Sequence, residues 1–205
     1  GGKSTIAHLI PRFFDVDLGT VSIGSVDIRQ MESRYLMEQV SFVFQDVYLF
    51  KQSIRDNIRL GNQNASDEQI QAAAKAAQCH DFIMALPNGY DTIIGEQGIH
   101  LSGGEQQRIA IARAIVKDAP VVVLDEATAF ADPENEYLIQ KAFEKLMHGK
   151  TVIIIAHRLS TVRNADHIIV MDHGRVAEEG SHDALLQKGG RYASMWKTYN
   201  ETASW

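Results

Sequence analysis

The chain of 205 residues is 45% hydrophobic, which is enough for one domain with a sizeable core. Its formal net charge of −6 gives no broad basic surface for nucleic acid or an anionic membrane. Its single cysteine, Cys79, excludes an intrachain disulfide and fits a reducing compartment. Apolar runs such as Val152–Ala156 are too short to span a bilayer and no signal peptide is visible, so any membrane role is expected to come through a partner or through sequence outside this chain.

The chain opens with Gly1-Gly2-Lys3-Ser4-Thr5 and has no initiating Met. These residues match the second half of the phosphate loop G-x-x-x-x-G-K-[ST], so we expect a fragment that begins inside that loop. Backbone N–H groups at the following helix start would bind phosphate oxygens, Lys3 would neutralise the β- and γ-phosphates, and the Ser4 hydroxyl would ligate Mg²⁺. A flexible glycine terminus before an ordinary helix cap is the alternative.

The first fifty residues predict one helix and two short strands. Residues 4–14 indicate a helix that leaves the phosphate loop and ends or bends near Ile10, because Pro11 follows. We expect short strands at Val21–Ile23 and Val40–Phe44, joined by a polar connection.

Residues 53–100 contain no convincing strand before Thr92 and are interpreted as a helical insertion. Within it, Asp67–Ala77 fits a helix with Ser66 or Asp67 as N-cap. A further helix is expected after Gly103-Gly104 and runs to about Lys117.

Strands and helices then alternate. The strands are apolar runs typical of a parallel sheet with both faces buried, at Val121–Leu124, Thr151–Ala156 and Ile168–Met171. A helix is expected at Glu134–Met147, and the tail from Ser181 onward is expected to be helical and amphipathic. The alternation predicts an α/β fold with a parallel sheet.

Two acids, Asp125 and Glu126, end the first of these apolar runs. A carboxylate at the C-terminal end of a parallel strand faces the crevice where ligands bind. Asp125 could hold Mg²⁺, directly or through water, and Glu126 could accept a proton from the attacking water or orient it. Two solvated acids in a strand-to-loop turn are the alternative.

The sequence Leu101-Ser102-Gly103-Gly104-Glu105 is the most specific motif. It describes a helix start with a Ser cap and two glycines that let backbone N–H groups approach a phosphate closely. A plain N-cap with an acid that matches the helix dipole is the alternative. Gln106-Gln107-Arg108 and the nearby Asp-Glu strand end favour the phosphate-binding interpretation.

In order and approximate spacing these motifs resemble the ATPase domains of ABC proteins, over nearly the whole chain. The resemblance implies a P-loop NTPase core, at residues 1–52 and 118–205, with an inserted α-helical subdomain at residues 53–117. It also implies that the strands before Gly1 are missing, among them the phosphate-loop strand and the strands that carry the adenine-stacking aromatic, so we expect this fragment to bind ATP poorly.

The resemblance assigns roles to single residues. Gly1–Thr5 match the end of Walker A, Asp125 and Glu126 match Walker B with its catalytic glutamate, Gln45 matches the Q-loop glutamine and His157 the switch histidine. Gln45 would reach Mg²⁺ or the water and sense the γ-phosphate, and His157 would hold the water and Glu126 in line. From the residues alone, the interpretation of Gln45 as a surface residue is favoured.

The resemblance further implies a head-to-tail dimer in which Ser102–Gly104 of one copy contact the γ-phosphate held by Lys3 of the other. ATP binding would close this dimer, and hydrolysis would reopen it. The partner would be a second nucleotide-binding domain, either a copy of this chain or a related chain.

Several segments favour the exporter branch, a half-transporter whose transmembrane domain precedes the ATPase and is expected to hold it at the cytoplasmic face of a bacterial inner membrane. These segments are Gln45–Phe50, Ser53–Ile58, Gly95–Gly98 and Ala156–Thr161. Where exporters usually have Ser-Ala-Leu-Asp, this chain has Ala129-Phe130-Ala131-Asp132, which keeps the D-loop carboxylate of Asp132. Similar variants occur in half-transporters of iron-siderophore traffic.

Two alternatives remain at this stage. A non-transport ABC ATPase of DNA repair or chromosome organisation is disfavoured by the acidic net charge and by the absence of a long coiled-coil insertion. A degenerate module that binds ATP without hydrolysing it is disfavoured because Glu126 and His157 are both present.

Overall fold

The computed structural model describes residues 2–44, 46–95, 99–125, 133–156 and 158–202. The chain forms two compact units, a first unit of residues 1–29 and 154–205 and a second unit of residues 30–153. The expected subdomain boundaries after residues 52 and 117 stay a prediction. Among the described residues, no helix is both long and apolar enough to cross a membrane.

The first unit begins with α1 (Lys3–Leu9), whose C-cap is Ile10, which confirms the helix end expected near that residue. Helix α1 ends before Pro11, because proline has no backbone N–H and its ring cannot continue the helical hydrogen-bond ladder. The next residues form a small antiparallel hairpin of β1 (Ser22–Ile23) and β2 (Val26–Asp27), and η1 (Ile28–Gln30) follows.

The C-terminal part of the first unit corrects one expectation. Ile168–Met171 was expected to be a fully buried strand of a parallel sheet, whereas β6 (Ile168–Asp172) pairs antiparallel with β7 (Arg175–Gly180), and Ile169 is 52% exposed. The cause is the two-residue turn at His173-Gly174, where both residues have positive φ and reverse the chain.

Three short helices complete this part: α8 (Leu159–Val162), α9 (His182–Lys188) and α10 (Arg191–Thr202). The helical tail expected from Ser181 is therefore confirmed. The core of this C-terminal part is a cluster of buried side chains from β6, α9 and α10, namely Ile168, Val170, Leu185 and Tyr192.

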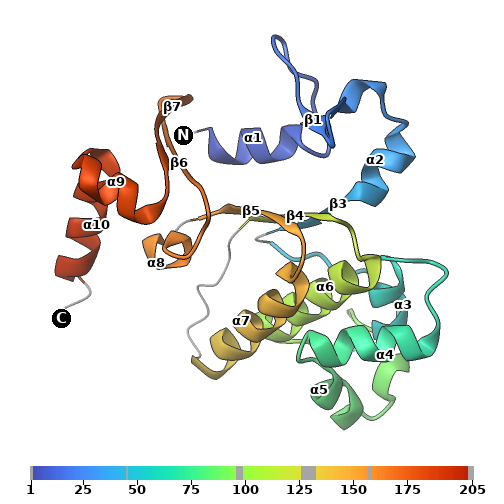
Figure 1. Ribbon diagram of the computed structural model, residues 1–205. Coiled ribbons are helices and arrows are strands. Elements are labelled where there is room, and N and C mark those ends of the chain that lie inside the picture. The colour runs from blue at the N-terminus through green and yellow to red at the C-terminus, as the bar shows by residue number, and fades with distance from the viewer. Residues whose placement is uncertain (1, 45, 96–98, 126–132, 157, 203–205) are drawn as a thin grey trace. The chain divides into compact units, whose positions relative to one another are not determined.

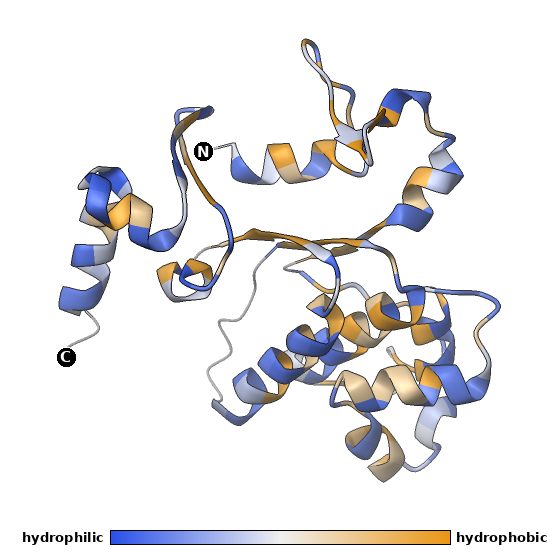
Figure 2. Ribbon diagram, viewed as in Figure 1, coloured by the Kyte–Doolittle hydropathy of each residue, from blue (hydrophilic) through white to orange (hydrophobic). Residues whose placement is uncertain are grey.

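The second unit contains a three-stranded sheet in the order β3-β4-β5, except that the last two residues of β5 are assigned to the first unit (Figure 1). The strands are β3 (Val40–Val43), β4 (Val121–Asp125) and β5 (Thr151–Ile155), close to their expected positions. β3 and β4 are parallel, with Val40 opposite Val121 and Val43 opposite Leu124. Hydrophobic residues are concentrated in these strands (Figure 2), and Val122 and Val123 are fully buried, which confirms the expected parallel α/β fold.

Helices make up the rest of the second unit. Their bounds are α2 (Ser33–Gln39), α3 (Ile54–Arg59), α4 (Asp67–Ala76), α5 (His80–Ala85), η2 (Gly89–Asp91), α6 (Gly103–Lys117) and α7 (Pro133–Met147). α3, α4 and α7 pack against α6 through fully buried isoleucines, Ile58, Ile70, Ile109 and Ile139 among them. Helix α6 is thus the central helix of the unit, and its first residues are the Ser102–Glu105 motif.

Candidate functional site

The phosphate-loop residues lie at the start of α1. Gly2 is the N-cap in the left-handed conformation, with φ of 100° and ψ of −7°, and a Cβ there would lie 3.4 Å from the Cα atom of Gly174. Lys3, Ser4 and Thr5 form the first helical turn and are exposed. The N-cap makes no side-chain hydrogen bond, and the first turn contains no acidic residue. No acid of this turn therefore neutralises the N–H groups and the positive dipole end of the helix.

Asp125 lies half-buried at the carboxyl end of β4, directly after four buried residues. Because β3 and β4 are parallel and in register, the chain leaves both strands at the same edge of the sheet. This edge is where Gln45 follows β3 and Glu126 follows β4 in the sequence, but both residues lie outside the described part of the chain.

The Ser102–Glu105 motif forms a reciprocal cap at the start of α6. The Ser102 Oγ accepts a hydrogen bond from the Glu105 N–H at 3.3 Å, and a carboxylate oxygen of Glu105 accepts the Ser102 N–H at 2.7 Å and its O–H at 2.9 Å. Ser102 and Gly103 are exposed, whereas Gly104 is buried. The cap fixes the direction of the helix start and leaves Ser102 and Gly103 on the surface, where a ligand of another molecule could reach them.

A polar cluster that the sequence did not predict holds the segment after β3 against α6. The Asn57 side chain is fully buried and accepts the Phe50 N–H at 2.9 Å while it donates to the Phe50 carbonyl at 3.0 Å. The Arg113 guanidinium of α6 donates to the Asn57 carbonyl at 2.9 Å, to its Oδ1 at 3.1 Å and to the Tyr48 carbonyl at 3.4 Å. These bonds fix the backbone of a loop whose aromatic side chains, Tyr48 and Phe50, remain 68% and 47% exposed.

The expected site residues are therefore distributed between the two units. Gly2–Thr5 belong to the first unit, and Ser102–Gly104 and Asp125 belong to the second. Outside the described residues lie Gly1, Gln45, Glu126, Asp132 and His157, together with residues 96–98 of the exporter-like segment and residues 129–131 before Asp132. The described residues contain no group of three or more His, Cys, Asp or Glu placed to hold a metal.

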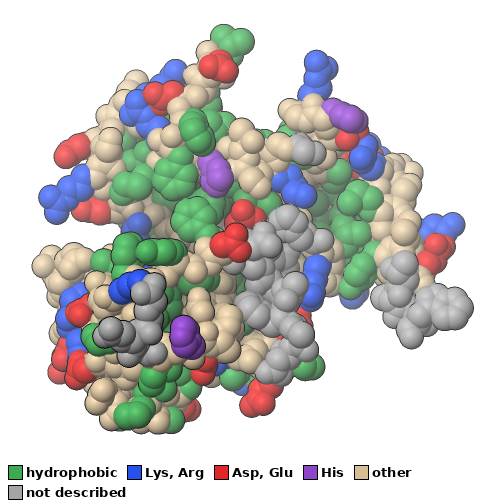
Figure 3. Space-filling model, turned by 180° about the vertical axis from the view of Figure 1, so that it is seen from behind, with side chains coloured by type: hydrophobic (Ala, Val, Ile, Leu, Met, Phe, Trp, Pro, Cys, Tyr) green, Lys and Arg blue, Asp and Glu red, His purple; other side chains and the backbone are tan. Residues whose placement is uncertain are grey.

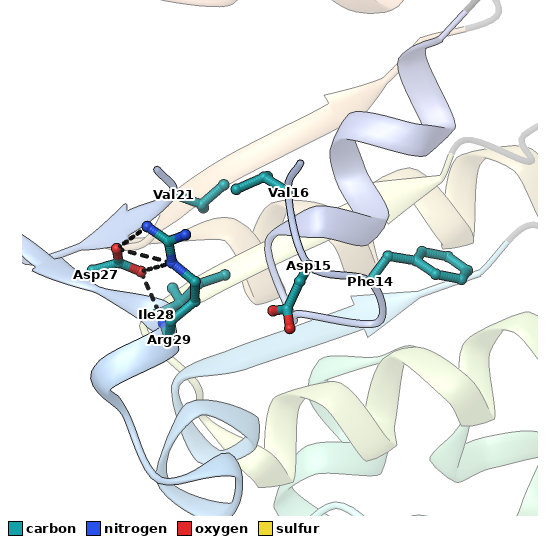
Figure 4. Close-up of a pocket in the computed structure, with 7 residues that line it drawn as sticks. All are labelled: Phe14, Asp15, Val16, Val21, Asp27, Ile28 and Arg29. Carbon is teal, nitrogen blue, oxygen red and sulfur yellow. Dashed lines mark hydrogen bonds and ion pairs between the residues drawn. The ribbon is translucent and has the colours of Figure 1, made fainter. Parts of the chain in front are cut away.

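A shallow pocket in the first unit is unrelated to these residues (Figure 4). It encloses essentially no volume that a water molecule could occupy, and its lining residues are Phe14, Asp15, Val16, Val21, Asp27, Ile28 and Arg29. The Arg29 guanidinium, at 2.7 Å from the Asp27 carboxylate, lowers the pKa of that carboxyl, and Asp15 is bonded by Arg12 from outside the lining, so each carboxylate of this pocket already has an arginine partner. The pocket does not replace the site expected from the motifs.

Comparison with known proteins gives a consistent result. Residues 1–129 match the family model described as "ABC transporter". The chain is 53% identical over 197 residues to the mycobactin import ATP-binding/permease protein IrtA of Mycolicibacterium smegmatis, and 52% identical over 196 residues to the ATP-dependent lipid A-core flippase of Legionella pneumophila. Each alignment covers 96% of this chain but only 23% of IrtA and 33% of the flippase.

A solved structure, that of a bacterial Atm1-family ABC exporter with ATP bound, is similar along almost the whole chain. The TM-score is 0.87 at 46% sequence identity, and the match covers 96% of this chain and 34% of that chain. The described fold is therefore shared with a protein whose structure contains ATP.

Proposed function

The chain belongs to the ABC transporter family, and we propose that it is the ATP-hydrolysing domain of an exporter-type member. The observation that carries the proposal is found in the second unit, where Asp125 ends a buried parallel strand and Ser102–Gly104 begin the central helix α6. Identity above 50% over 95–96% of the chain to an ATP-binding/permease protein and to ATP-dependent flippases supports it.

The residues at the start of α1 fit the phosphate groups of ATP. The backbone at Gly2 has a positive φ, so a residue with a side chain would be strained there, and its Cβ would lie at ordinary van der Waals distance from Gly174. In the proposed site, Gly1–Thr5 donate backbone N–H groups to phosphate oxygens, and Lys3 neutralises the β- and γ-phosphates.

The donor set also fits Mg²⁺, a hard cation that prefers oxygen ligands. The proposed ligands are the Ser4 hydroxyl, the Gln45 side-chain carbonyl and the Asp125 carboxylate. When bound, the ion supplies charge neutralisation for the transferred phosphoryl group.

Hydrolysis is assigned to residues that follow the strands of the central sheet in the sequence. Glu126 accepts a proton from the attacking water, His157 keeps the water and Glu126 in line, and Gln45 senses the γ-phosphate. Asp132 makes the D-loop contact to the second domain. Catalysis consists mainly of positioning and electrostatic stabilisation.

The proposed assembly is a head-to-tail pair of ATPase domains, each fused to a transmembrane domain. The ATPase domains lie at the cytoplasmic face of a bacterial inner membrane. Ser102, Gly103 and Gly104 of one copy contact the γ-phosphate held by the other copy, which places ATP in the interface. The proposal does not extend to a cargo, because a relative named for mycobactin import and relatives named for lipid A-core flipping are equally similar to this chain.

The alternative of a DNA-repair or chromosome ABC ATPase has no comparable support. On the face seen in Figure 3, acidic and basic side chains are interspersed and form no basic stripe. Together with the net charge of −6, this distribution disfavours nucleic acid as a partner.

The assignment of Glu126 is tested by Glu126→Gln in the natural full-length protein. We expect ATP turnover to fall by about 10²-fold or more, since a positioned general base contributes roughly that factor, while ATP binding is retained. The matched control is Glu144→Gln, which makes the same chemical change on the exposed side of α7. Unchanged turnover in Glu126→Gln would remove Glu126 from the catalytic role.

A further inference from the structure

Gly104, the last glycine of the Ser102–Glu105 motif, is packed directly against helix α7. A Cβ at Gly104 would lie 2.8 Å from the Oδ1 atom of Asn135 and 3.1 Å from its Cβ. Such distances are far below van der Waals contact, so the Asn135 side chain occupies the space that any other residue at position 104 would need. The start of α6 and the first turn of α7, which lie side by side (Figure 1), therefore fix each other's position.

A buried charge strengthens the same contact. Arg108, one turn further along α6, is 5% exposed, and its Nη1 donates to the Asn135 Oδ1 at 2.6 Å. Its guanidinium also lies 5.4 Å from the centre of the Phe82 ring. A buried guanidinium that loses an acceptor is costly, so this hydrogen bond strongly favours one placement of Asn135.

Asn135 also connects two parts of the proposed ATPase site. It is the third residue of α7, three positions after Asp132 and nine after Glu126 in the sequence. We infer that Asn135 is a positioning residue: it fixes the Ser102–Gly104 helix start relative to the first turn of α7, so that the backbone N–H groups of the motif meet the γ-phosphate of the partner copy. This inference rests on the proposed function.

The contact is tested in the natural full-length protein with variants of similar size. Asn135→Leu keeps the volume and removes the acceptor, whereas Asn135→Asp keeps an acceptor oxygen for Arg108. Gln140→Leu, at an exposed position of the same helix, is the matched control. The measurements are the kcat and KM for ATP, the binding of a fluorescent ATP analogue, the thermal unfolding temperature, and hydrogen exchange over residues 101–106.

Asn135→Leu is expected to lower kcat about tenfold, since sub-ångström misplacement of a transition-state contact has effects of this order, and to accelerate exchange over residues 101–106. Analogue binding is expected to change by less than about twofold, because nucleotide binds first to the Lys3 side of the site. Asn135→Asp and Gln140→Leu are expected to behave like the parent protein. A variant that is merely unstable would instead lose binding capacity and kcat together.

Three results would overturn the inference: parental kcat in Asn135→Leu, parental exchange over residues 101–106, or an Asn135→Asp variant that fails as Asn135→Leu does. Should Asn135→Leu fold poorly, Asn135→Ala removes the same acceptor without adding an apolar branch and is measured in the same way. If the parent protein does not hydrolyse ATP, the proposed function fails, while the exchange experiment still decides whether Asn135 orders the start of α6.

Discussion

Glu178 shows how one carboxylate joins two elements of the first unit. It lies on β7, and its oxygens accept the N–H groups of Arg191 at 2.8 Å and Tyr192 at 2.9 Å, at the start of α10. These bonds to Tyr192 and Arg191 lower the pKa of Glu178 below its ordinary value of 4.5. A Cβ at Gly190 would collide with the Glu178 carboxylate, so any larger residue there would displace the carboxylate from this position. Glu178 is thus the anionic cap of α10.

This cap predicts a specific pH dependence. Because the folded-state pKa is below the unfolded value, the stabilisation by Glu178 is fully present above pH 4.5 and is lost as the pH falls through the lower folded-state pKa. Glu178→Gln is expected to lower the unfolding temperature at neutral pH and to reduce its decline on acidification. Unfolding temperatures measured between about pH 7 and pH 3 test this. Glu144→Gln, at an exposed position of α7, is the control, and parallel curves for parent and Glu178→Gln would contradict the prediction.

At the scale of elements, α4 and α6 begin with the same capping box. In α4 the Ser66 Oγ accepts the Gln69 N–H at 3.3 Å and the Gln69 side chain accepts the Ser66 N–H at 2.8 Å, and in α6 Ser102 and Glu105 repeat this arrangement. The same capping hydrogen bonds therefore stabilise the starts of both helices. Only the second is proposed to contact ATP.

The pair allows capping to be separated from function. Ser66→Ala and Ser102→Ala are each expected to lower the free energy of unfolding by about 1 kcal/mol, the usual cost of a lost N-cap. Only Ser102→Ala is expected to lower ATP turnover as well, because only the Ser102 hydroxyl and the neighbouring N–H groups are proposed to contact the phosphate held by the partner copy. Chemical denaturation and steady-state ATPase assays of both variants make the comparison. Equal loss of turnover in both would show that Ser102 acts only as a cap.

Local signals explain which elements the sequence could predict. α4, α6 and β4 carry strong signals, a capping box or an uninterrupted apolar run, and they form at or close to the expected positions. β6 has a similar apolar run, yet its pairing is decided by the turn at His173-Gly174, which joins it to β7 and not to the central sheet. Apolar composition predicts a strand, and the turn after it predicts the partner.

At the scale of the whole molecule, contacts between distant residues escape prediction from one sequence. Arg113 bonds Asn57 across 56 positions and Arg108 bonds Asn135 across 27, and nothing local to these residues marks them as partners. The sequence allows the site residues to be proposed, because phosphate and Mg²⁺ need particular residue types at particular spacings. It does not predict the supporting contacts, because many residue pairs could supply them.

The head-to-tail arrangement predicts that two defective copies can complement each other. Each proposed site takes Lys3 from one copy and Ser102 from the other, so a dimer of a Lys3→Ala copy and a Ser102→Phe copy contains one site with both defects and one site with none. Each variant alone gives dimers in which both sites are defective. The measurement is the ATPase activity of full-length mixed dimers, purified through two different tags.

Mixed dimers are expected to have about half of the parental activity if the two sites work independently, whereas each variant alone has little. If instead each site were built within one copy, both sites of the mixed dimer would carry a defect, and mixing would restore nothing. The expected rescue follows from the head-to-tail symmetry of the dimer, because such an interface brings two different surfaces together at every site. The control is a mixed dimer of Lys3→Ala and Glu126→Gln copies: both residues belong to the same half-site, so neither of its sites is intact and no rescue is expected.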